Sequence, residues 1–414
     1  MVGAGNRGYL AYGAYAERHP DKARFVAVVE PDEGRRARFA DAHGLPRDRQ
    51  LSSWEELAAR PRIAPALVNA TMDRTHRSST LALLAAGYDV LLEKPMATTP
   101  EECAEIVRAA ESGDRLLQIA HVMRYAPFFL AIRDIVTSGR LGEIVSLDWR
   151  ENLAYWHFAH SYVRGNWAST GRAGPMILTK CCHDLDLLVW LFGACDRLSS
   201  FGSLTHFTRD AVGPEIPDRC TDGCPIADSC PYFAPRVYLD RLRENPRSFA
   251  LAAVTLDRTP EGVMRALETG PYGRCVYRCD NDVVDHQVVV MRFGRGLAVS
   301  LTMQGASHVE GRTVRIDGTR ASLLANESRS EIDVHDHCSG KSETSRVARG
   351  VGGHGGGDEG LMSAFVAAVR GDRDGVRTSA RESLQSHLLA FAAERSRASS
   401  EVINMDDYVA IARG

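Results

Sequence analysis

The sequence predicts an α/β protein of two domains, a parallel doubly wound sheet followed by a domain with a mostly antiparallel sheet. At 414 residues the chain exceeds the size at which one core stops growing. Up to about residue 122, short apolar strands alternate with helical stretches, which is typical of a parallel sheet. Longer alternating runs follow, such as 288–293 and 297–303, and these favour an antiparallel sheet with one covered face.

Composition excludes several classes of function. A net charge of -3 and a pI near 6.5 provide no basic footprint for nucleic acid. No apolar run reaches the roughly 18 residues of a membrane span, and no cationic-then-apolar leader opens the chain. The 10 cysteines are too sparse for a disulfide scaffold in so long a chain. We therefore expect a cytoplasmic protein with no nucleic acid and no membrane as partners.

The chain opens on a G-x-G-x-x-G turn. Such glycines allow a tight turn, the close approach of a pyrophosphate and strand-to-helix packing. A helix to Arg18 and a strand over 25–30 follow, and Glu30 ends that strand about 20 residues after the turn, where an acid would bind a ribose 2′-hydroxyl. The alternative is an acid that merely ends a strand. Since only Met1 and Val2 precede the turn, we expect the first strand to begin upstream, where a targeting segment could also lie. The residues expected to bind a dinucleotide here are Gly3, Gly5, Asn6, Arg7, Gly8 and Glu30.

The alternation then continues to a domain boundary near 123–143, so that 1–122 forms the first domain and 123–414 the second. The expected elements are a strand at 66–71, a helix at 77–86, strands at 90–93 and 116–121 around a helix at 101–111, a helix at 127–138 and a strand from 143 to 151.

The strand ending at Leu92 is followed by Glu93, Lys94 and Pro95. Proline cannot continue the hydrogen-bond ladder, so the chain leaves the sheet at a carboxyl end, where open α/β sheets bind ligands. Of the 50 basic residues only four are lysines, which an arginine-favouring codon bias would explain. A lysine retained inside a motif then indicates a need for a compact ammonium, and Lys94 and Lys180 both qualify.

The stretch 175–193 predicts an amphipathic helix, because Leu185 and Phe192 belong to an i, i+3, i+4, i+7 apolar stripe. Lys180, His183 and Asp184 have the spacing i, i+3, i+4 on another face. We expect this helix to present Lys180 and His183 together. The alternative is a structural histidine.

The segment 155–167 is both aromatic and polar, as a polyhydroxylated substrate would require. The alternative is a packing loop between domains. The substrate contacts expected in it are Tyr155, Trp156, His157, His160, Arg164 and Trp167.

Three cysteines, Cys220, Cys224 and Cys230, lie close together in a Cys-rich loop at about 206–235. Structural zinc needs four ligands, so Cys182 or His206 is the expected fourth. Because the spacing is not that of a standard zinc finger, free thiols and a disulfide stay open as alternatives.

The chain resembles the glucose–fructose oxidoreductase / inositol dehydrogenase family (Gfo/Idh/MocA). The matching parts are GAGNRG at 3–8, Glu30, LLEKP at 91–95 and HDLD at 183–186. The resemblance implies a Rossmann NAD-binding domain, then an α/β domain whose large open sheet mediates a homodimer or homotetramer. It implies NAD, with NADP as the alternative cofactor, and a carbohydrate-like small-molecule substrate.

Carried over by position, the resemblance makes Lys94 and His183 catalytic. Many members have an aspartate four residues before that histidine, where this chain has Thr179, so Lys180 could replace part of the proton relay. A base with a pKa near 7 would suit His183, with Lys94 holding the same substrate oxygen. The resemblance also suggests a cis Lys94–Pro95 bond. Further expected contacts are Glu93 and Pro95 to the cofactor, and Arg124, Asp184 and His354 to the substrate.

These observations together predict an NAD-dependent oxidoreductase that transfers a hydride between nicotinamide and a hydroxyl carbon of a sugar, inositol or sugar-acid derivative. The first alternative is an NAD-dependent glycoside hydrolase that oxidises its substrate transiently. The second is a non-catalytic protein that senses dinucleotide, against which intact Lys94 and His183 argue.

Overall fold

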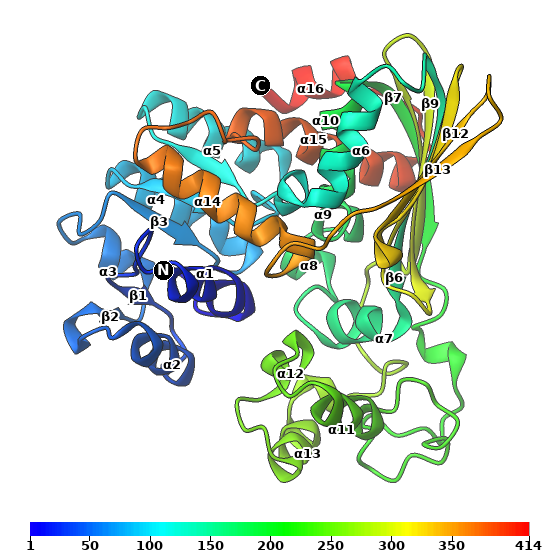
Figure 1. Cartoon of the computed structure of the whole chain (residues 1–414). Helices are drawn as coiled ribbons and strands as arrows, with labels where there is room; N and C mark the ends of the chain where they lie inside the picture. Colours follow the sequence, from blue (N-terminus) through cyan, green and yellow to red (C-terminus); the bar gives the residue numbers. More distant parts are fainter. Residues whose placement is uncertain (414) are drawn as a thin grey trace.

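The computed structural model describes residues 1–413. Figure 1 shows the N-terminal domain in blue at one side, a large sheet at the other, and the C-terminal helices between them. Within residues 1–413, no helix is long and apolar enough to cross a membrane.

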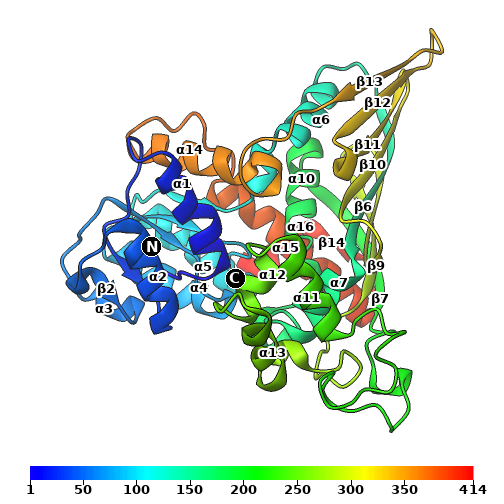
Figure 2. The same ribbon diagram turned by 60° about the horizontal axis from the view of Figure 1, so that its bottom comes forward.

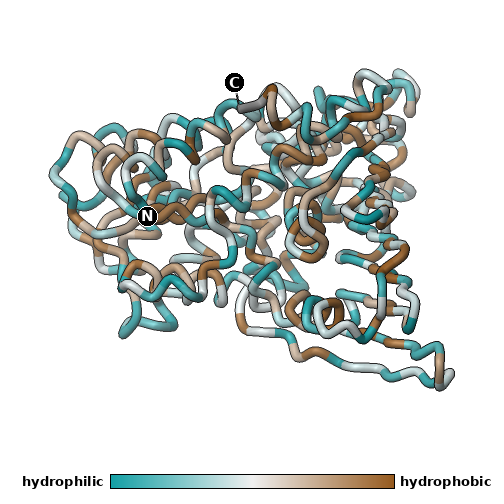
Figure 3. Tube along the Cα trace, turned by 90° about the horizontal axis from the view of Figure 1, so that it is seen from above, coloured by the Kyte–Doolittle hydropathy of each residue, from teal (hydrophilic) through white to brown (hydrophobic). Residues whose placement is uncertain are grey.

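The first domain contains a parallel sheet in two pieces joined by Val2. Val2 forms parallel bridges to both Val29 and Asn69, so the strand order is β2-β1-Val2-β3-β4-β5. The predicted parallel, doubly wound sheet is confirmed, although β1 is shorter than the strand expected over 25–30. In Figure 3 its central strands appear as brown, apolar segments beside the N-terminus. The strands are β1 (Val28–Val29), β2 (Gln50–Leu51), β3 (Ala66–Asn69), β4 (Asp89–Leu92) and β5 (Leu117–Ile119).

Three helices of this domain, α2, α3 and α5, begin at side-chain caps. Asp32 accepts a hydrogen bond from the Arg35 amide at the start of one helix, and Thr99 caps another that has Pro100 in its first turn. The elements are η1 (Arg7–Gly13, a π-helix), α1 (Ala14–Arg18), α2 (Glu33–His43), α3 (Trp54–Ala58), α4 (His76–Ala85), α5 (Pro100–Ser112) and η4 (Val122–Tyr125).

The second domain is built on a nine-stranded sheet of order β13-β12-β11-β10-β6-β9-β8-β7-β14. Within this nine-stranded sheet, as described over residues 1–413, only the β6–β9 pair is parallel, so the expected mostly antiparallel sheet is confirmed. Its strands are β6 (Ile144–Ala154), β7 (Cys195–Ser203), β8 (His286–Phe293), β9 (Leu297–Ser307), β10 (Gly311–Gly318), β11 (Ala321–Asn326), β12 (Glu331–Asp336), β13 (Ser342–Arg346) and β14 (Ile403–Asn404).

Helices cover one face of this sheet and leave the other open, as Figure 2 shows. Along β8, buried and exposed residues alternate, which places Val289 inside and Val290 outside. Phe201 and Leu324 also project from the open face, and they are 66% and 49% exposed. The covering helices include α6 (Pro127–Thr137), α10 (Cys182–Phe192) and α15 (Ala380–Ser399).

The stretch 175–193 is not one helix, which corrects the prediction. Helix α9 (Met176–Thr179) ends before Lys180, and α10 begins after Cys181. Lys180 and Cys181 form a turn between the two helices, and the Lys180 ammonium pairs with Glu151 of β6. The segment 155–167 is also more helical than expected, since it forms α7 (Tyr155–Phe158) and η5 (Ala159–Arg164).

A helical insertion, defined here as residues 234–273, packs as a unit with its own core. It consists of α11 (Ala234–Glu244), α12 (Phe249–Val254), α13 (Pro260–Thr269) and the short η7 (Pro271–Gly273). Its core is centred on Tyr238 and Leu251. The insertion reaches back to the glycine turn, because the Asn6 side-chain amide donates a hydrogen bond to the Phe249 carbonyl. It was not predicted from the sequence.

The end of the chain returns to the first domain. Helix α14 (Gly357–Val369) contacts η1 and η4, and α15 packs against both α5 and β7. A capping box of Ser379 and Glu382 starts α15. Two short segments, β14 and α16 (Met405–Arg413), close the described chain. Side chains from α14 and the loop before it can therefore take part in a site between the domains.

Candidate active site

Lys94 belongs to the first domain, and its side chain contacts the second domain. It follows β4, its peptide bond to Pro95 is cis as predicted, and its Nζ atom donates a 2.8 Å hydrogen bond to the Thr179 carbonyl at the end of α9. The Lys94 amide donates to Glu93 Oε2 at 3.0 Å. The ammonium is thus fixed at the interface of the two domains, beside the start of the helix that carries His183.

The glycine turn has the shape that a dinucleotide requires. Gly3 has a φ of 86°, and a Cβ there would come within 2.4 Å of the Ala70 carbonyl oxygen. A Cβ on Gly8 would come within 2.1 Å of the Gly3 oxygen, whereas the space beside Gly5 is open. Glu30 accepts hydrogen bonds from the Ala4 amide at 2.8 Å and the Asp32 amide at 3.1 Å, which leaves acceptor positions for ribose hydroxyls. These residues fit NAD.

Arg7 and Glu93, both expected to touch the cofactor, are paired with one another. Arg7 also forms a two-pronged ion pair with Asp358 of α14, with hydrogen bonds of 3.0 and 2.9 Å, and donates to the Tyr12 hydroxyl. Burial raises the pKa of Glu93, but the Arg7 charge, the Tyr12 hydrogen bond and the Lys94 charge together lower that pKa overall. Both carboxylates therefore stay charged, and the network joins the glycine turn to the C-terminal part of the chain.

His183 lies between two other imidazoles. Its ring centroid is 5.7 Å from that of His121 and 5.9 Å from that of His354. The residue is 5% exposed, and Nδ1 is buried without a hydrogen-bond partner within residues 1–413. Burial and the nearby Lys94 charge hold the pKa of His183 well below its usual value, so the ring is neutral at physiological pH. A neutral imidazole is the form that accepts a proton.

Lys180 belongs to a buried ion-pair network. Its Nζ atom is 3.0 Å from Glu151 and 3.8 Å from Glu310, which also pairs with His157 at 2.9 Å. Burial lowers the pKa of Lys180, but the charges of Glu151 and Glu310 outweigh it and raise that pKa. Lys180 is therefore a fixed cation. Glu151 and Glu310 were missed in the sequence, because Glu151 lies within β6 and Glu310 just before β10, and no local motif marks either.

Four expected substrate contacts are buried and occupied by other partners. Asp184 accepts from Trp149 at 2.8 Å and from Arg312 at 2.9 Å, so it fixes α10 on the sheet. The Arg124 guanidinium donates two hydrogen bonds of 2.7 Å to the carboxylate of Asp186, which lies in the same helix as Asp184.

The other two occupied side chains lie against the helical insertion. His160 bonds the Tyr238 hydroxyl at 2.8 Å and stacks on a second tyrosine of the insertion. Arg164 donates to the carbonyl oxygens of Arg274 and Tyr232. Both therefore act as anchors of that insertion, as the alternative of a packing segment implied.

The remaining aromatic residues divide between contacts to the first domain and contacts to the insertion or its preceding loop. The Trp167 indole donates a 2.8 Å hydrogen bond to Asp73, whose pKa is raised by burial although the charges of His76 and Lys94 oppose the rise. Trp167 thus lies toward the first domain. The other aromatic contacts join the segment to the insertion and its preceding loop, namely Trp156 under the Arg241 guanidinium and Tyr155 against Tyr232.

The expected zinc site is not supported. Among residues 1–413 no group of three or more histidine, cysteine or acidic side chains has the arrangement to hold a metal ion, and all ten cysteines are free thiols. Cys182 is buried in α10 near Lys94, and His206 packs on Phe207, so neither serves as a fourth ligand. Cys220 instead receives a hydrogen bond from the Arg164 guanidinium. This arrangement favours the alternative of free thiols.

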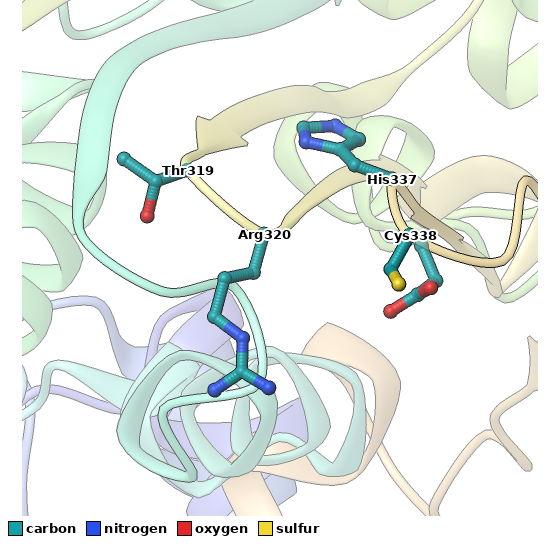
Figure 4. A pocket seen from close by; sticks show the side chains of 5 residues that line it. Thr319, Arg320, His337 and Cys338 are labelled. Atoms are coloured by element: carbon teal, nitrogen blue, oxygen red, sulfur yellow. The ribbon is translucent and has the colours of Figure 1, made fainter.

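A surface cavity at the far turns of the sheet contains none of the candidate residues. It lies between the β10–β11 turn and the end of β12, as Figure 4 shows, and its lining is formed by Thr319, Arg320, Asp336, His337 and Cys338.

Comparison with known proteins agrees with this geometry. Residues 1–121 match the model of the Gfo/Idh/MocA oxidoreductase family, NAD-binding Rossmann fold, and residues 133–405 match its C-terminal alpha/beta domain. The putative oxidoreductase YteT of Bacillus subtilis is 25% identical over 72% of this chain and 70% of its own length. Inositol 2-dehydrogenase 2 of Saccharopolyspora erythraea is 32% identical over 41% of this chain and 47% of its own. The chain thus spans about half of the latter relative.

Solved structures share the whole fold. Levoglucosan dehydrogenase in complex with NADH and L-sorbose is 19% identical with a TM-score of 0.70, covering 98% of this chain and 97% of that one. The WlbA dehydrogenase of Bordetella pertussis, in complex with NADH and UDP-GlcNAcA, is 18% identical with a TM-score of 0.66, covering 97% of each. With both family models matched along nearly its entire length, the chain belongs to the Gfo/Idh/MocA family of NAD(P)-dependent oxidoreductases.

Proposed function

We propose that this protein is an NAD-dependent dehydrogenase that oxidises a secondary hydroxyl of a sugar, inositol or sugar acid, or reduces the corresponding ketone. The observation that carries the proposal is the hydrogen bond of Lys94, from the first domain, to the Thr179 carbonyl, four residues before His183 in the second domain. Lys94 is hydrogen-bonded to the end of α9, and its charge acts on His183 at the start of α10. An ammonium and a neutral imidazole at one point are what hydroxyl oxidation requires.

The glycine turn and Glu30 would hold the dinucleotide. Gly5 leaves room for the pyrophosphate, and Glu30 has free acceptor positions for the adenosine ribose. Arg7, Tyr12 and Glu93 would support the turn through their hydrogen bonds to one another. When bound, NAD supplies the nicotinamide that exchanges the hydride.

The protein's own residues manage the proton and the charge on oxygen. His183 Nε2 would accept the proton of the reacting hydroxyl, because the ring is neutral. Lys94 would donate to the same oxygen and stabilise the negative charge that develops on it. Lys180, Glu310 and His157 form a polar group joined to Glu151, and they would hydrogen-bond other hydroxyls of the substrate.

A turnover screen tests the proposal. The protein is incubated with NAD⁺ and a panel of sugars, inositols and sugar acids, and formation of NADH is followed by its absorbance. Catalysis of at least one member is expected, with loss in a Lys94→Ala variant that still binds NADH. Release of an aglycone from glycosides without net NADH would favour a hydrolase instead. NADH binding with no turnover of either kind would favour a dinucleotide-sensing protein.

We also propose that the open face of the nine-stranded sheet mediates a homodimer or homotetramer. Three apolar side chains on that face are exposed: Phe201 and Val290, on the adjacent strands β7 and β8, are 66% and 51% exposed, and Leu324, further across the sheet on β11, is 49% exposed. Burial of such side chains between two sheets would stabilise association by roughly 25 cal/mol per Å² of apolar surface.

A further inference from the structure

His354 lies in a glycine strap, residues 350–357, that joins the edge of the sheet to α14. His354 has a φ of 51°, in the left-handed region that a residue with a side chain seldom adopts. The neighbouring glycines make this path accessible, since a Cβ on Gly357 would come within 2.3 Å of the Val122 oxygen and one on Gly353 within 2.3 Å of Asp358. Backbone strain of this kind clusters at functional sites, which directs attention to what the strap holds.

A hydrogen bond to Asp358 fixes the orientation of the His354 ring. Nδ1 of His354 is 3.0 Å from Asp358 Oδ1, and the same carboxylate is gripped by Arg7. Burial raises the pKa of Asp358, but the Arg7 charge and the hydrogen bonds from His354 and Arg7 contribute to a net lowering, so the group stays a carboxylate. A carboxylate only accepts hydrogen bonds, so Nδ1 of His354 carries the proton. Nε2 of His354 is then the ring nitrogen that can accept a second proton.

His183 has two imidazole neighbours, and they differ in their access to solvent. His121 is fully buried, and neither of its ring nitrogens has a hydrogen-bond partner in the part of the chain that the structure describes. Burial and the Arg124 and Lys94 charges keep the pKa of His121 well below its usual value. The His354 side chain is 33% exposed. Of these two imidazole neighbours, His354 is therefore the one that is open to solvent.

The charges around the two histidines favour a positive charge on His354 over one on His183. Lys94, Arg312 and the two neighbouring histidines act on His183, and all of them disfavour a positive charge there. His354 instead faces the negative charge of Asp358 on one side and His183 on the other. Thr179 provides no carboxylate to His183, and its hydroxyl is turned to the Pro175 carbonyl.

We propose that His354, held by Asp358, is a positioning residue that carries the proton between His183 and solvent. The N–H bond on His183 breaks, an N–H bond forms at Nε2 of His354, and the resulting imidazolium releases its proton to water. No electrons change hands in this step. The 5.9 Å ring separation leaves room for direct transfer after a small rotation or for one bridging water. The inference rests on the proposed dehydrogenase function.

Two variants, His354→Gln and His354→Ala, test this role, with His335→Gln as the matched control. His335 is an exposed histidine on β12 that contacts Ser342, far along the sheet from the strap. For the two variants we expect kcat on a polyol oxidised by the wild type to fall by roughly 10²-fold, the lower range for a displaced acid–base group. Imidazole added to the His354→Ala protein should restore at least about a tenth of wild-type kcat, as for a lost proton carrier. The control should keep full activity.

Fluorescence titration with NADH separates the proton role from a structural one. Dissociation constants within about threefold of the wild type, equivalent to about 0.65 kcal/mol, are expected, because the variants leave the residues of the glycine turn unchanged. Unchanged kcat in His354→Gln would overturn the inference, and so would a loss that imidazole does not relieve. Either result in an active wild type leaves the dehydrogenase proposal standing. A wild type that binds NADH but oxidises no polyol overturns both.

Discussion

Lys94 donates a 2.8 Å hydrogen bond from Nζ to the carbonyl oxygen of Thr179, the last residue of α9. A carbonyl at a helix end lacks an intrahelical partner and carries partial negative charge, so it suits an ammonium. The contact joins the end of β4 to the junction of α9 and α10. It therefore fixes both the direction of Lys94 and the relative position of two elements that build the candidate site.

Replacement of Lys94 by arginine should nearly abolish turnover. A planar guanidinium cannot reproduce the compact ammonium at both the Thr179 carbonyl and the substrate oxygen. His183→Ala should lower kcat by roughly 10²–10⁴-fold, as expected for a lost acid–base group. Steady-state kinetics on the best substrate of the polyol screen would measure both. Retention of more than about half of kcat in Lys94→Arg would contradict the role given to the ammonium.

Stability should fall with acidification well before the carboxylates titrate. Burial lowers the pKa of His160 and of His387 to about 3, from 6.5 in the unfolded chain. Because the folded pKa values are depressed, the unfolded state binds more protons between these limits, so stability is full above about pH 6.5 and declines toward pH 3. At about pH 5, each of the two histidines should lower the free energy of unfolding by on the order of 2 kcal/mol. Urea unfolding at a series of pH values measures the slope.

The His160→Gln variant provides the control for that pH dependence. His160 receives or donates one hydrogen bond, with the Tyr238 hydroxyl, and glutamine retains that capacity without titrating. The variant should therefore show a shallower decline of unfolding free energy between about pH 6.5 and 5, by roughly half of the two-histidine effect. An identical slope in wild type and variant would mean that His160 does not stay neutral in the folded protein.

Much of the fold could be predicted from the sequence because its strands and helices are local patterns. The strand ending at Leu92 and the helix at 127–138 were placed within one or two residues of β4 and α6. The ion pair of Lys180 could not be predicted, because its partner Glu151 is distant in sequence and lies on another element. The hydrogen bond of His160 could not be predicted either, since its partner Tyr238 lies in an insertion without a local signal.

Cofactor choice should depend on Glu30. Its carboxylate is held by the Ala4 and Asp32 amides at the end of β1, where it would repel the 2′-phosphate of NADP. Wild-type protein should bind NADH more tightly than NADPH. Glu30→Gln should reduce the ratio of the two dissociation constants by roughly tenfold, the equivalent of about 1.4 kcal/mol. Paired fluorescence titrations with the two dinucleotides measure it. Equal affinities in the wild type would refute the assignment of Glu30.

Self-association should depend on the open sheet face. Phe201→Glu places a charge where Phe201 is 66% exposed, beside Val288 of the next strand, and a charge resists burial between two sheets. Light scattering should show a dimer or tetramer for the wild type and a smaller species for the variant. Val351→Glu, an equally exposed apolar position outside the sheet, is the control and should leave the assembly unchanged. A monomeric wild type would contradict the proposal.

The ion pair between Lys180 and Glu151 allows a test of whether Lys180 stabilises the fold through its buried charge network. Lys180→Met leaves Glu151 fully buried with Arg312 as its remaining partner, which should destabilise the fold by up to about 3 kcal/mol. Adding Glu151→Gln removes the unpaired charge and should recover part of that loss, whereas Lys341→Met, at an exposed turn, should cost almost nothing. A double-mutant cycle by urea unfolding measures the coupling. If the two losses simply add, the 3.0 Å contact contributes no interaction energy, and Lys180 is then retained for substrate rather than for the fold.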